Sequence, residues 1–207
     1  VRVMRDPVTR IDPTARTAWM GDQRLSADAL VVAVGAELEP NAIPGFGEYA
    51  YNVYDPQEIP RAGQARNEFQ GGTVLIGIFG IPYKCPPAPY EMALLIRETL
   101  QARGVKSNVE VFTPQPVSMP LLGQVGCDII EGRLADHGIT FLPNRKAVAV
   151  ELGEVVFANE RRRFDLLFGI PPQRPPAVVR ESGLVGESGW VSVNSRTLET
   201  QFPGVYA

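Results

Sequence analysis

The stretch G-G-T-V-L-I-G-I-F-G, residues 71–80, is the clearest signal of fold class in this sequence. After two glycines it is apolar at almost every position, which is typical of a strand buried on both faces of a parallel sheet. Prolines follow, and residues 87–102 then carry apolar side chains at helical spacing, with Gly104 as the stop signal. N-V-E-V-F-T, residues 108–113, is predicted to be a second strand. A strand, a helix and a strand in this order form a right-handed crossover unit, which predicts a parallel sheet.

The rest of the chain extends this α/β pattern. Residues 124–137 are predicted to form a helix, and three short strands are predicted between residues 140 and 158. The basic run R-R-R, residues 161–163, is expected to be a solvated turn. F-D-L-L-F-G, residues 164–169, is predicted to be another buried strand, and L-V-V-A-V-G-A, residues 30–36, is expected to be buried on both faces. The predicted fold class is α/β: a Rossmann-like dinucleotide-binding domain of parallel sheet, helices and a β-meander.

Composition narrows the class of protein and of partner. The chain has 207 residues, of which 44% are hydrophobic and 21% are charged, as in ordinary globular proteins. The net charge of -3 removes the main electrostatic reason to expect nucleic acid or an anionic membrane as a partner. No apolar run approaches the roughly 20 residues of a transmembrane helix, and none is predicted. Cys85, Cys127 and the single His137 do not form a metal-binding pattern, so no metal site is predicted.

The loop after the first strand departs from a nucleotide-binding fingerprint. G-x-G-x-x-G would let a pyrophosphate rest on the following helix, whereas residues 77–82 are G-I-F-G-I-P, with the glycines spaced wrongly and Pro82 near the close turn. Thr113 and Pro114 stand where an acidic residue would hold the ribose. NAD is therefore not expected to bind this unit. The alternative role of Gly77 and Gly80 is packing between helix and strand.

The loop also carries Y-K-C-P-P-A-P-Y-E, residues 83–91. If the helix begins near Pro87, Cys85 lies at its first turn, where unpaired N–H groups and the helix dipole favour an anion. The charge of Lys84 acts in the same direction, so a reactive thiolate is one interpretation. The other is a buried, inert cysteine. Glu91 is either a helix-starting acid or a proton carrier, and Cys127 is interpreted as a structural residue of the next helix.

The segment K-C-P-P-A-P-Y-E resembles the active-site segment of flavocytochrome c sulfide dehydrogenases and sulfide:quinone oxidoreductases. These are flavoproteins of the pyridine nucleotide-disulfide oxidoreductase superfamily, which has two dinucleotide folds. A-D-A-L-V-V-A-V-G-A, residues 27–36, F-D-L-L-F-G-I-P-P, residues 164–172, and residues 182–207 agree with the same pattern. The resemblance covers essentially the whole chain, and the cysteine segment is its specific part.

The resemblance implies a FAD-dependent oxidoreductase that takes electrons from sulfide or a related small sulfur donor. It implies a cytochrome c subunit or a quinone as the electron acceptor, and a periplasmic or peripheral membrane location. In that family a second cysteine, from a part that this chain does not contain, also handles the sulfur. The implied catalytic residues are Cys85, which holds the sulfur beside the flavin, and Glu91, and the implied cofactor-binding residues are Gly35, Ala36, Pro82 and Lys84.

The resemblance also implies the domain organisation. Residues 1–46 and 164–207 are expected to be segments of an incomplete FAD-type domain, residues 47–70 a connector, and residues 71–163 a central NAD(P)-binding-like domain. The sequence opens without an initiator Met and without the first glycine fingerprint, so we expect a fragment of a longer chain. Such a fragment is expected to bind FAD weakly or not at all, and to be inactive by itself.

Two alternatives stay open. One is an NAD(P)H-dependent flavin disulfide or ferredoxin-type reductase, for which a cytoplasmic location is expected. The other is a non-catalytic module with a degenerate nucleotide fold, which a buried, unreactive Cys85 would support.

Overall fold

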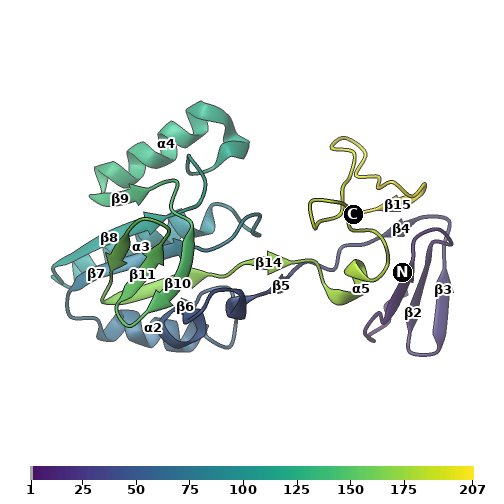
Figure 1. Cartoon of the computed structure of the whole chain (residues 1–207), viewed down its shortest axis with the longest axis horizontal. Coiled ribbons are helices and arrows are strands. Elements are labelled where there is room, and N and C mark those ends of the chain that lie inside the picture. The colour runs from purple at the N-terminus through teal and green to yellow at the C-terminus, as the bar shows by residue number, and fades with distance from the viewer. Residues whose placement is uncertain (1) are drawn as a thin grey trace. The chain divides into compact units, whose positions relative to one another are not determined.

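The computed structural model describes residues 2–207, which form two compact units (Figure 1). Unit 1 joins the segment that ends at Glu37 to Arg174–Ala207, and unit 2 is the continuous segment Leu38–Gln173. The chain therefore leaves unit 1 once and returns to it once. Where it crosses, the short strands β5 (Glu37–Leu38) and β14 (Gln173–Arg174) pair with each other.

Unit 2 is built on a five-stranded sheet in which all neighbouring strands are parallel. The crossover between β7 and β8 is the strand, helix and strand unit that the sequence predicts, and the α/β fold class is confirmed. In spatial order the strands are β6 (Tyr51–Asn52), β13 (Leu166–Ile170), β7 (Gly72–Ile78), β8 (Ser107–Phe112) and β9 (Ile139–Leu142).

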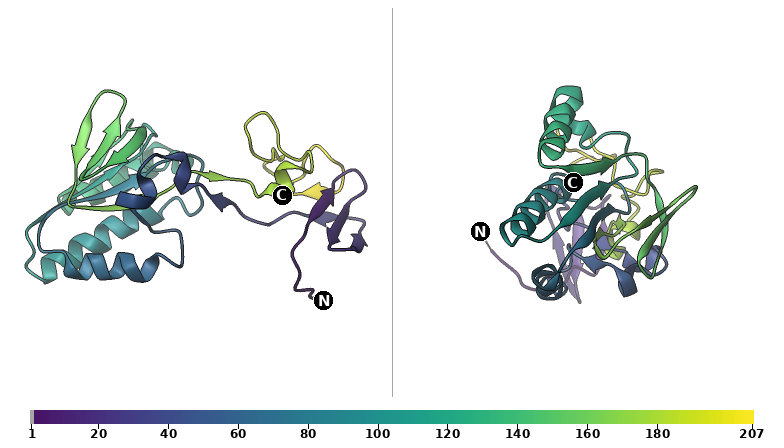
Figure 2. Two further views of the ribbon diagram at one scale, coloured as in Figure 1. Left: turned by 60° about the horizontal axis from the view of Figure 1, so that its bottom comes forward. Right: turned by 90° about the vertical axis from the view of Figure 1, so that its left-hand side faces the viewer.

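Helices pack on one face of this sheet and an antiparallel ribbon on the other (Figures 1 and 2). The helical layer contains α2 (Ile59–Glu68), α3 (Ala88–Ala102) and α4 (Gly123–Asp136). The opposite layer contains the short helix α1 (Phe46–Tyr49) and an antiparallel meander, β10 (Ala147–Glu151), β11 (Glu154–Phe157) and β12 (Arg161–Arg163). The strand predicted at residues 140–142 belongs instead to the parallel sheet, as β9.

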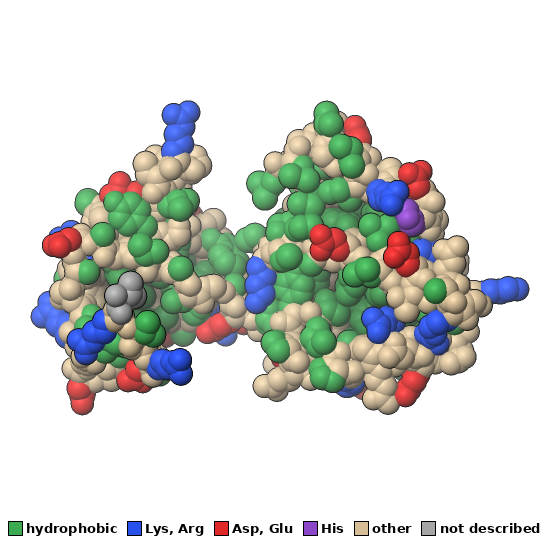
Figure 3. Space-filling view, turned by 180° about the vertical axis from the view of Figure 1, so that it is seen from behind, with side chains coloured by type: hydrophobic (Ala, Val, Ile, Leu, Met, Phe, Trp, Pro, Cys, Tyr) green, Lys and Arg blue, Asp and Glu red, His purple; other side chains and the backbone are tan. Residues whose placement is uncertain are grey.

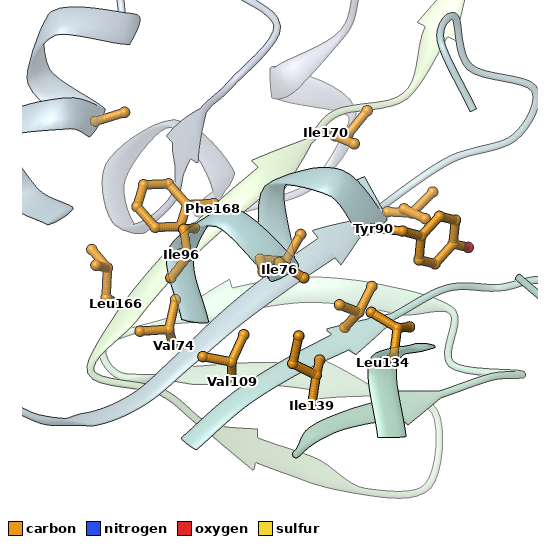
Figure 4. Close-up of a cluster of buried hydrophobic side chains, with 14 of the residues drawn as sticks. Val74, Ile76, Tyr90, Ile96, Val109, Leu134, Ile139, Leu166, Phe168 and Ile170 are labelled. Atoms are coloured by element: carbon orange, nitrogen blue, oxygen red, sulfur yellow. The ribbon is translucent and has the colours of Figure 1, made fainter. Parts of the chain in front are cut away.

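Alternation along β7 divides the core of unit 2 into two clusters. Val74, Ile76 and Ile78 point to the helical layer, where they pack with side chains of α3 and α4 (Figure 4). Leu75 points to the ribbon. Both faces are buried, which explains why nearly every position of this strand is apolar.

Two glycines make room for aromatic rings on the ribbon side. A Cβ on Gly77 would lie 2.3 Å from Phe112 Cζ, and a Cβ on Gly169 would lie 2.4 Å from Phe46 Cε2. The ring of Phe79 packs edge to face against both Phe46 and Phe112, with centroids 4.9 and 5.1 Å apart. Gly77 therefore has a packing role, but against aromatic rings on the ribbon face of the sheet rather than between helix and strand.

Unit 1 has a smaller core, in which Ile11, Val32, Val179, Leu184 and Val205 are buried. Its antiparallel sheet contains β1 (Arg10–Asp12), β2 (Thr17–Met20) and β3 (Gln23–Ser26), and the parallel pair β4 (Leu30–Val31) and β15 (Val205–Tyr206) lies beside the short helix α5 (Ala177–Arg180).

Two expectations from the sequence are wrong. Residues 30–36 contain a strand of only two residues, and Val31 and Val34 are exposed, because β15 is the one strand that pairs with β4 among the described residues. Arg161–Arg163, which composition suggests to be a solvated turn, is strand β12. Its arginines form ion pairs with carboxylates of β10 and β11 and, through Arg162, with Glu110 of β8, which lies in the parallel sheet. These pairs make a basic edge strand possible.

Candidate active site

The loop between β7 and α3 carries Cys85. It leaves the sheet at Ile78 and reaches the helix at Ala88. Cys85 is exposed, and its backbone is left-handed, with φ at 54°. Residues other than glycine seldom adopt this conformation. The loop lies at the carboxyl end of the parallel sheet, which is the edge where α/β folds bind ligands.

Hydrogen bonds hold the backbone on either side of Cys85. The Tyr54 hydroxyl lies within hydrogen-bond distance of two carbonyl oxygens. It is 2.7 Å from the Lys84 oxygen and 3.1 Å from the Cys85 oxygen. The Lys84 N–H donates to Gln173 Oε1 at 3.1 Å, and the Ala88 N–H donates to the Cys85 carbonyl at 3.0 Å. The thiol therefore projects from a backbone that is fixed on both sides.

The start of α3 is not the anion site that the sequence suggests. Several residues at this point are prolines without an N–H group, and the Ala88 N–H is taken by the Cys85 carbonyl. The next two N–H groups, of Tyr90 and Glu91, donate to the Pro87 carbonyl. The expectation of unpaired donors beside the thiol is therefore wrong. Only the helix dipole and the charge of the neighbouring lysine remain to favour an anion.

Two tyrosine hydroxyls lie close to the thiol. Burial raises the pKa of Tyr83 to about 12, and the nearby Cys85 adds to this effect. Burial, and then Cys85, likewise raises the pKa of Tyr54. Tyr83 donates to the Pro86 carbonyl at 3.1 Å, and Lys84 Nζ lies 5.9 Å from the centroid of the Tyr54 ring. Both hydroxyls stay protonated at neutral pH and act as hydrogen-bond donors.

Glu91 lines a different surface feature, an apolar groove between α2 and α3. The groove has a volume of about 320 Å³ and includes Ile59, Met92 and Leu95 in its walls. Hydrophobic side chains are gathered on this helical face of unit 2 (Figure 3). Among the contacts of residues 2–207, none joins Glu91 to Cys85.

Pro82 lines a smaller cavity of about 110 Å³ near the same loop. The peptide bond from Ile81 to Pro82 is cis. Tyr83, Ser118 and Met119 form other parts of the wall. Pro82 and Lys84 thus stand on either side of Tyr83 in the loop that carries Cys85.

Gly35 and Ala36 belong to unit 1. Gly35 has φ at 72°, and the space where its Cβ would lie is open. It lines an apolar cavity of about 140 Å³ together with Val32, Trp190 and Ala207. A glycine beside an open apolar cavity fits the close approach of a flat aromatic group such as a flavin. The cavity is smaller than sites that enclose a whole cofactor, so these residues fit contact with one part of FAD.

The second cysteine and the histidine lie apart from this chemistry. Cys127 is 1% exposed on α4, as expected for a structural residue, and both cysteines are free thiols. His137 ends α4, and its Nδ1 lies 2.9 Å from the Arg133 carbonyl.

Within the described part of the chain, no group of three His, Cys, Asp or Glu side chains is placed to hold a metal ion. No helix among residues 2–207 is long and apolar enough to cross a bilayer.

Sequence reasoning missed two residues that hold the Cys85 loop. Gln173 follows β13, which pairs in parallel with β7, so its position could be inferred from the meeting of their carboxyl ends. Tyr54 follows β6, a strand of two residues within a stretch rich in Pro, Gly and Asn. No periodic signal marks so short a strand.

Comparison with known proteins agrees with the fold and with the cysteine segment. Residues 63–120, which include Cys85, match the family model described as the central part of the sulfide dehydrogenase [flavocytochrome c] flavoprotein chain. The whole chain is 22% identical to the mitochondrial sulfide:quinone oxidoreductase of Mus musculus, covering 49% of that protein. With the Schizosaccharomyces pombe enzyme it shares 26% identity over 89% of this chain and 44% of the relative. The chain thus spans about half the length of the curated relatives it matches.

Solved structures show the same architecture. The sulfide:quinone oxidoreductase of Aquifex aeolicus matches 98% of this chain and 51% of its own, with a TM-score of 0.79 and 20% identity. A NAD-dependent persulfide reductase from A. fulgidus matches 97% of this chain and 37% of its own, with a TM-score of 0.60 and 20% identity.

The chain therefore shares the fold of sulfide:quinone oxidoreductases and of flavoprotein disulfide reductases. In sequence, the chain is similar along its length to sulfide:quinone oxidoreductases, and the segment that includes Cys85 is similar to the central part of the flavocytochrome c sulfide dehydrogenase flavoprotein chain.

Proposed function

We propose that the intact protein oxidises sulfide or a related small sulfur donor, with Cys85 as the thiol that holds the sulfur. The observation that carries this proposal is the Cys85 loop. The thiol is exposed, its backbone is fixed by hydrogen bonds, and it lies within the segment that matches the sulfide dehydrogenase family. Cys127 is buried and offers no second thiol to the substrate.

Formation of a persulfide on Cys85 requires an acceptor for two electrons. The Cys85 thiol and hydrogen sulfide together lose two electrons and two protons as the S–S bond of a persulfide forms, and a quinone gains them to become a quinol. Bound FAD would supply the group that takes up these electrons on the way. Gly35 and Ala36 would contact part of that cofactor, because the apolar cavity beside Gly35 leaves room for a ring.

Other residues of the loop have proposed roles. Lys84 would attract the anionic form of sulfide toward the loop through its charge. Pro82 would shape the wall of the small cavity beside the loop and face the cofactor. Glu91 would act as a proton carrier only if its side chain turned from the groove toward the thiol.

A quinone is favoured as the acceptor, because the similar curated proteins are named sulfide:quinone oxidoreductases. The family resemblance also implies a cytochrome c subunit, but none of these relatives supports that partner. Reduction of a soluble quinone analogue and of cytochrome c by the sulfide-reduced protein would distinguish the two acceptors.

The test is anaerobic bleaching of the flavin absorbance of the intact protein. We expect sulfide to bleach it and NADH not to. Cys85→Ala should abolish bleaching by sulfide, whereas the matched Cys127→Ala variant should retain it. Bleaching by NADH alone, or full sulfide activity in Cys85→Ala, would overturn the proposal.

A NAD(P)H-dependent sulfur reductase is the second candidate. It is favoured by the fold shared with the NAD-dependent persulfide reductase of A. fulgidus. The packing of Gly77 against Phe112 and of Gly80 against Pro172 argues against it, since both glycines are explained without a phosphate. The NADH arm of the same experiment decides between the two candidates.

A further inference from the structure

Among the groups that join the Cys85 loop to the sheet, a tyrosine hydroxyl contacts Cys85 itself. The Tyr54 hydroxyl lies 2.7 Å from the Lys84 carbonyl oxygen and 3.1 Å from the Cys85 carbonyl oxygen. Because one hydroxyl has one proton, the two carbonyls share it. Two consecutive carbonyls are thereby held around one donor.

Tyr54 is itself well anchored. Its N–H donates to Asn52 Oδ1 at 3.0 Å, and Asn52 is buried in β6. Strand β6 pairs in parallel with β13, with Asn52 opposite Gly169. The hydroxyl is therefore presented from the rigid sheet to the loop.

The backbone that Tyr54 holds, at Cys85, has a conformation that residues other than glycine seldom adopt. Cys85 has φ at 54°, where its Cβ is crowded by its own backbone. A residue other than glycine stays there only when its surroundings hold it. The Ala88 N–H bond to the Cys85 carbonyl is the other contact that depends on this conformation.

We propose that Tyr54 is a positioning residue that keeps Cys85 in the left-handed conformation and so fixes where its thiol reacts. The inference rests on the proposed role of Cys85 in sulfur oxidation. Burial raises the pKa of Tyr54 above its ordinary value, with a further contribution from Cys85, so the hydroxyl remains a donor at neutral pH.

The first test measures the loop without any reaction. Hydrogen exchange at the Ala88 amide reports on the bond to the Cys85 carbonyl. In the intact protein, Tyr54→Phe should speed this exchange about fivefold, as expected for the loss of one hydrogen bond. Tyr51→Phe is the matched control, because the Tyr51 hydroxyl makes no hydrogen bond among the described residues. Its exchange rate at Ala88 should equal that of the wild type.

A second variant tests the cause. Glycine adopts a positive φ freely, so adding Cys85→Gly to Tyr54→Phe should bring the exchange rate back toward the wild-type value. An unchanged rate in Tyr54→Phe would overturn the proposal. A faster rate that Cys85→Gly fails to restore would overturn it as well, because Tyr54 would then act elsewhere.

The third measurement connects the conformation to the reaction. At saturating sulfide, Tyr54→Phe should bleach the flavin about tenfold more slowly than the wild type with unchanged flavin content, because a misplaced thiol reacts slowly even when substrate is bound. Tyr51→Phe should bleach at the wild-type rate. A wild-type rate in Tyr54→Phe would overturn the positioning role. A wild-type flavin that sulfide fails to bleach would instead count against the proposed function, while the exchange measurements still decide the conformational role.

Discussion

At the scale of single residues, Glu110 is the one Asp, Glu, Lys or Arg side chain that is buried among the described residues. Its side chain is 8% exposed on β8, and both carboxylate oxygens accept hydrogen bonds from Arg162 at 2.6 Å. We expect Arg162→Ala to lower the free energy of unfolding by about 2 kcal/mol. This is below the range for fully buried pairs, because the Arg162 side chain is 42% exposed. Denaturant unfolding measures the change.

The neighbouring arginine provides the control. The Arg163 side chain is 90% exposed and is paired only with Glu154, at 3.3 Å, among the ion pairs of the described residues. Arg163→Ala removes the same kind of side chain from the same strand and should leave the free energy of unfolding unchanged. Equal losses in the two variants would mean that the strand, rather than the buried pair, is responsible.

Tyr83 makes stability depend on pH in the alkaline range. Burial raises its pKa from 10.0 to about 12, so the folded protein holds this proton more tightly than the unfolded chain. The stabilisation is complete below pH 10 and is lost as the pH rises through 12. The free energy of unfolding should therefore fall over this interval, and the fall should be smaller in Tyr83→Phe.

Absorbance of tyrosinate provides the direct check. Burial also raises the pKa of Tyr90, whose hydroxyl donates to the Ser118 carbonyl at 2.6 Å. We expect Tyr83 and Tyr90 to ionise late in the titration, close to the pH at which the protein unfolds. Early ionisation of all six tyrosines, near pH 10 as in free tyrosine, would contradict this expectation.

Local sequence features could identify some residues of the candidate site but not others. Cys85 could be singled out because its prolines and the following helix are local features. The sequence also shows that these prolines have no N–H group to offer an anion. By contrast, the hydrogen bond from the Ala88 N–H to the Cys85 carbonyl depends on a positive φ that no local pattern predicts. Tyr54 is about thirty residues away from Cys85 in the sequence and is brought near by the pairing of β6 with β13.

At the scale of secondary-structure elements, the glycine of β7 allows a sharp test of packing. Gly77→Ala would place a methyl group 2.3 Å from Phe112 Cζ and 2.6 Å from Phe79 Cε2. Rings packed on both sides leave no room for it, so we expect the free energy of unfolding to fall by about 2 kcal/mol. Urea unfolding measures the loss.

A glycine-to-alanine substitution in α2 should instead raise the free energy of unfolding. Gly63 lies inside that helix, and no atom lies within 4 Å of where its Cβ would be. Gly63→Ala should therefore stabilise the protein by about 0.5 kcal/mol through higher helix propensity. If Gly77→Ala proved neutral, the packing explanation of the altered fingerprint would fail.

Elements with local signals were predicted well. The helices α3 and α4 and the strands β7 and β8 follow from apolar periodicity and from the glycines and prolines that bound them. The two wrong elements depend on distant partners. An apolar run such as residues 30–36 becomes a long buried strand only with neighbours on both sides. The three arginines form β12 because each has a carboxylate partner from β8, β10 or β11.

At the scale of the whole molecule, unit 2 has what it needs to fold alone. It is one continuous segment, Leu38–Gln173, with two hydrophobic clusters on the two faces of one sheet. Unit 1 depends on two separate segments and a small core. We expect residues 38–173, expressed alone, to unfold cooperatively and to show dispersed amide resonances.

The control for this prediction is a chain that keeps the unit 1 segments and lacks unit 2. Residues 1–37 joined to 174–207 by a short glycine linker should show weaker amide protection than residues 38–173. A molten, uncooperative 38–173 would indicate that unit 2 needs the other segments to fold.

The pairing of β5 with β14 has a consequence for how such proteins diversify. The entry and the exit of unit 2 are adjacent strands, so the ends of the host segments meet where the inserted segment departs. Insertions succeed at such points, because closing the gap costs little chain entropy. One recombination event at these two positions could therefore replace the whole inserted domain and leave the host segments intact.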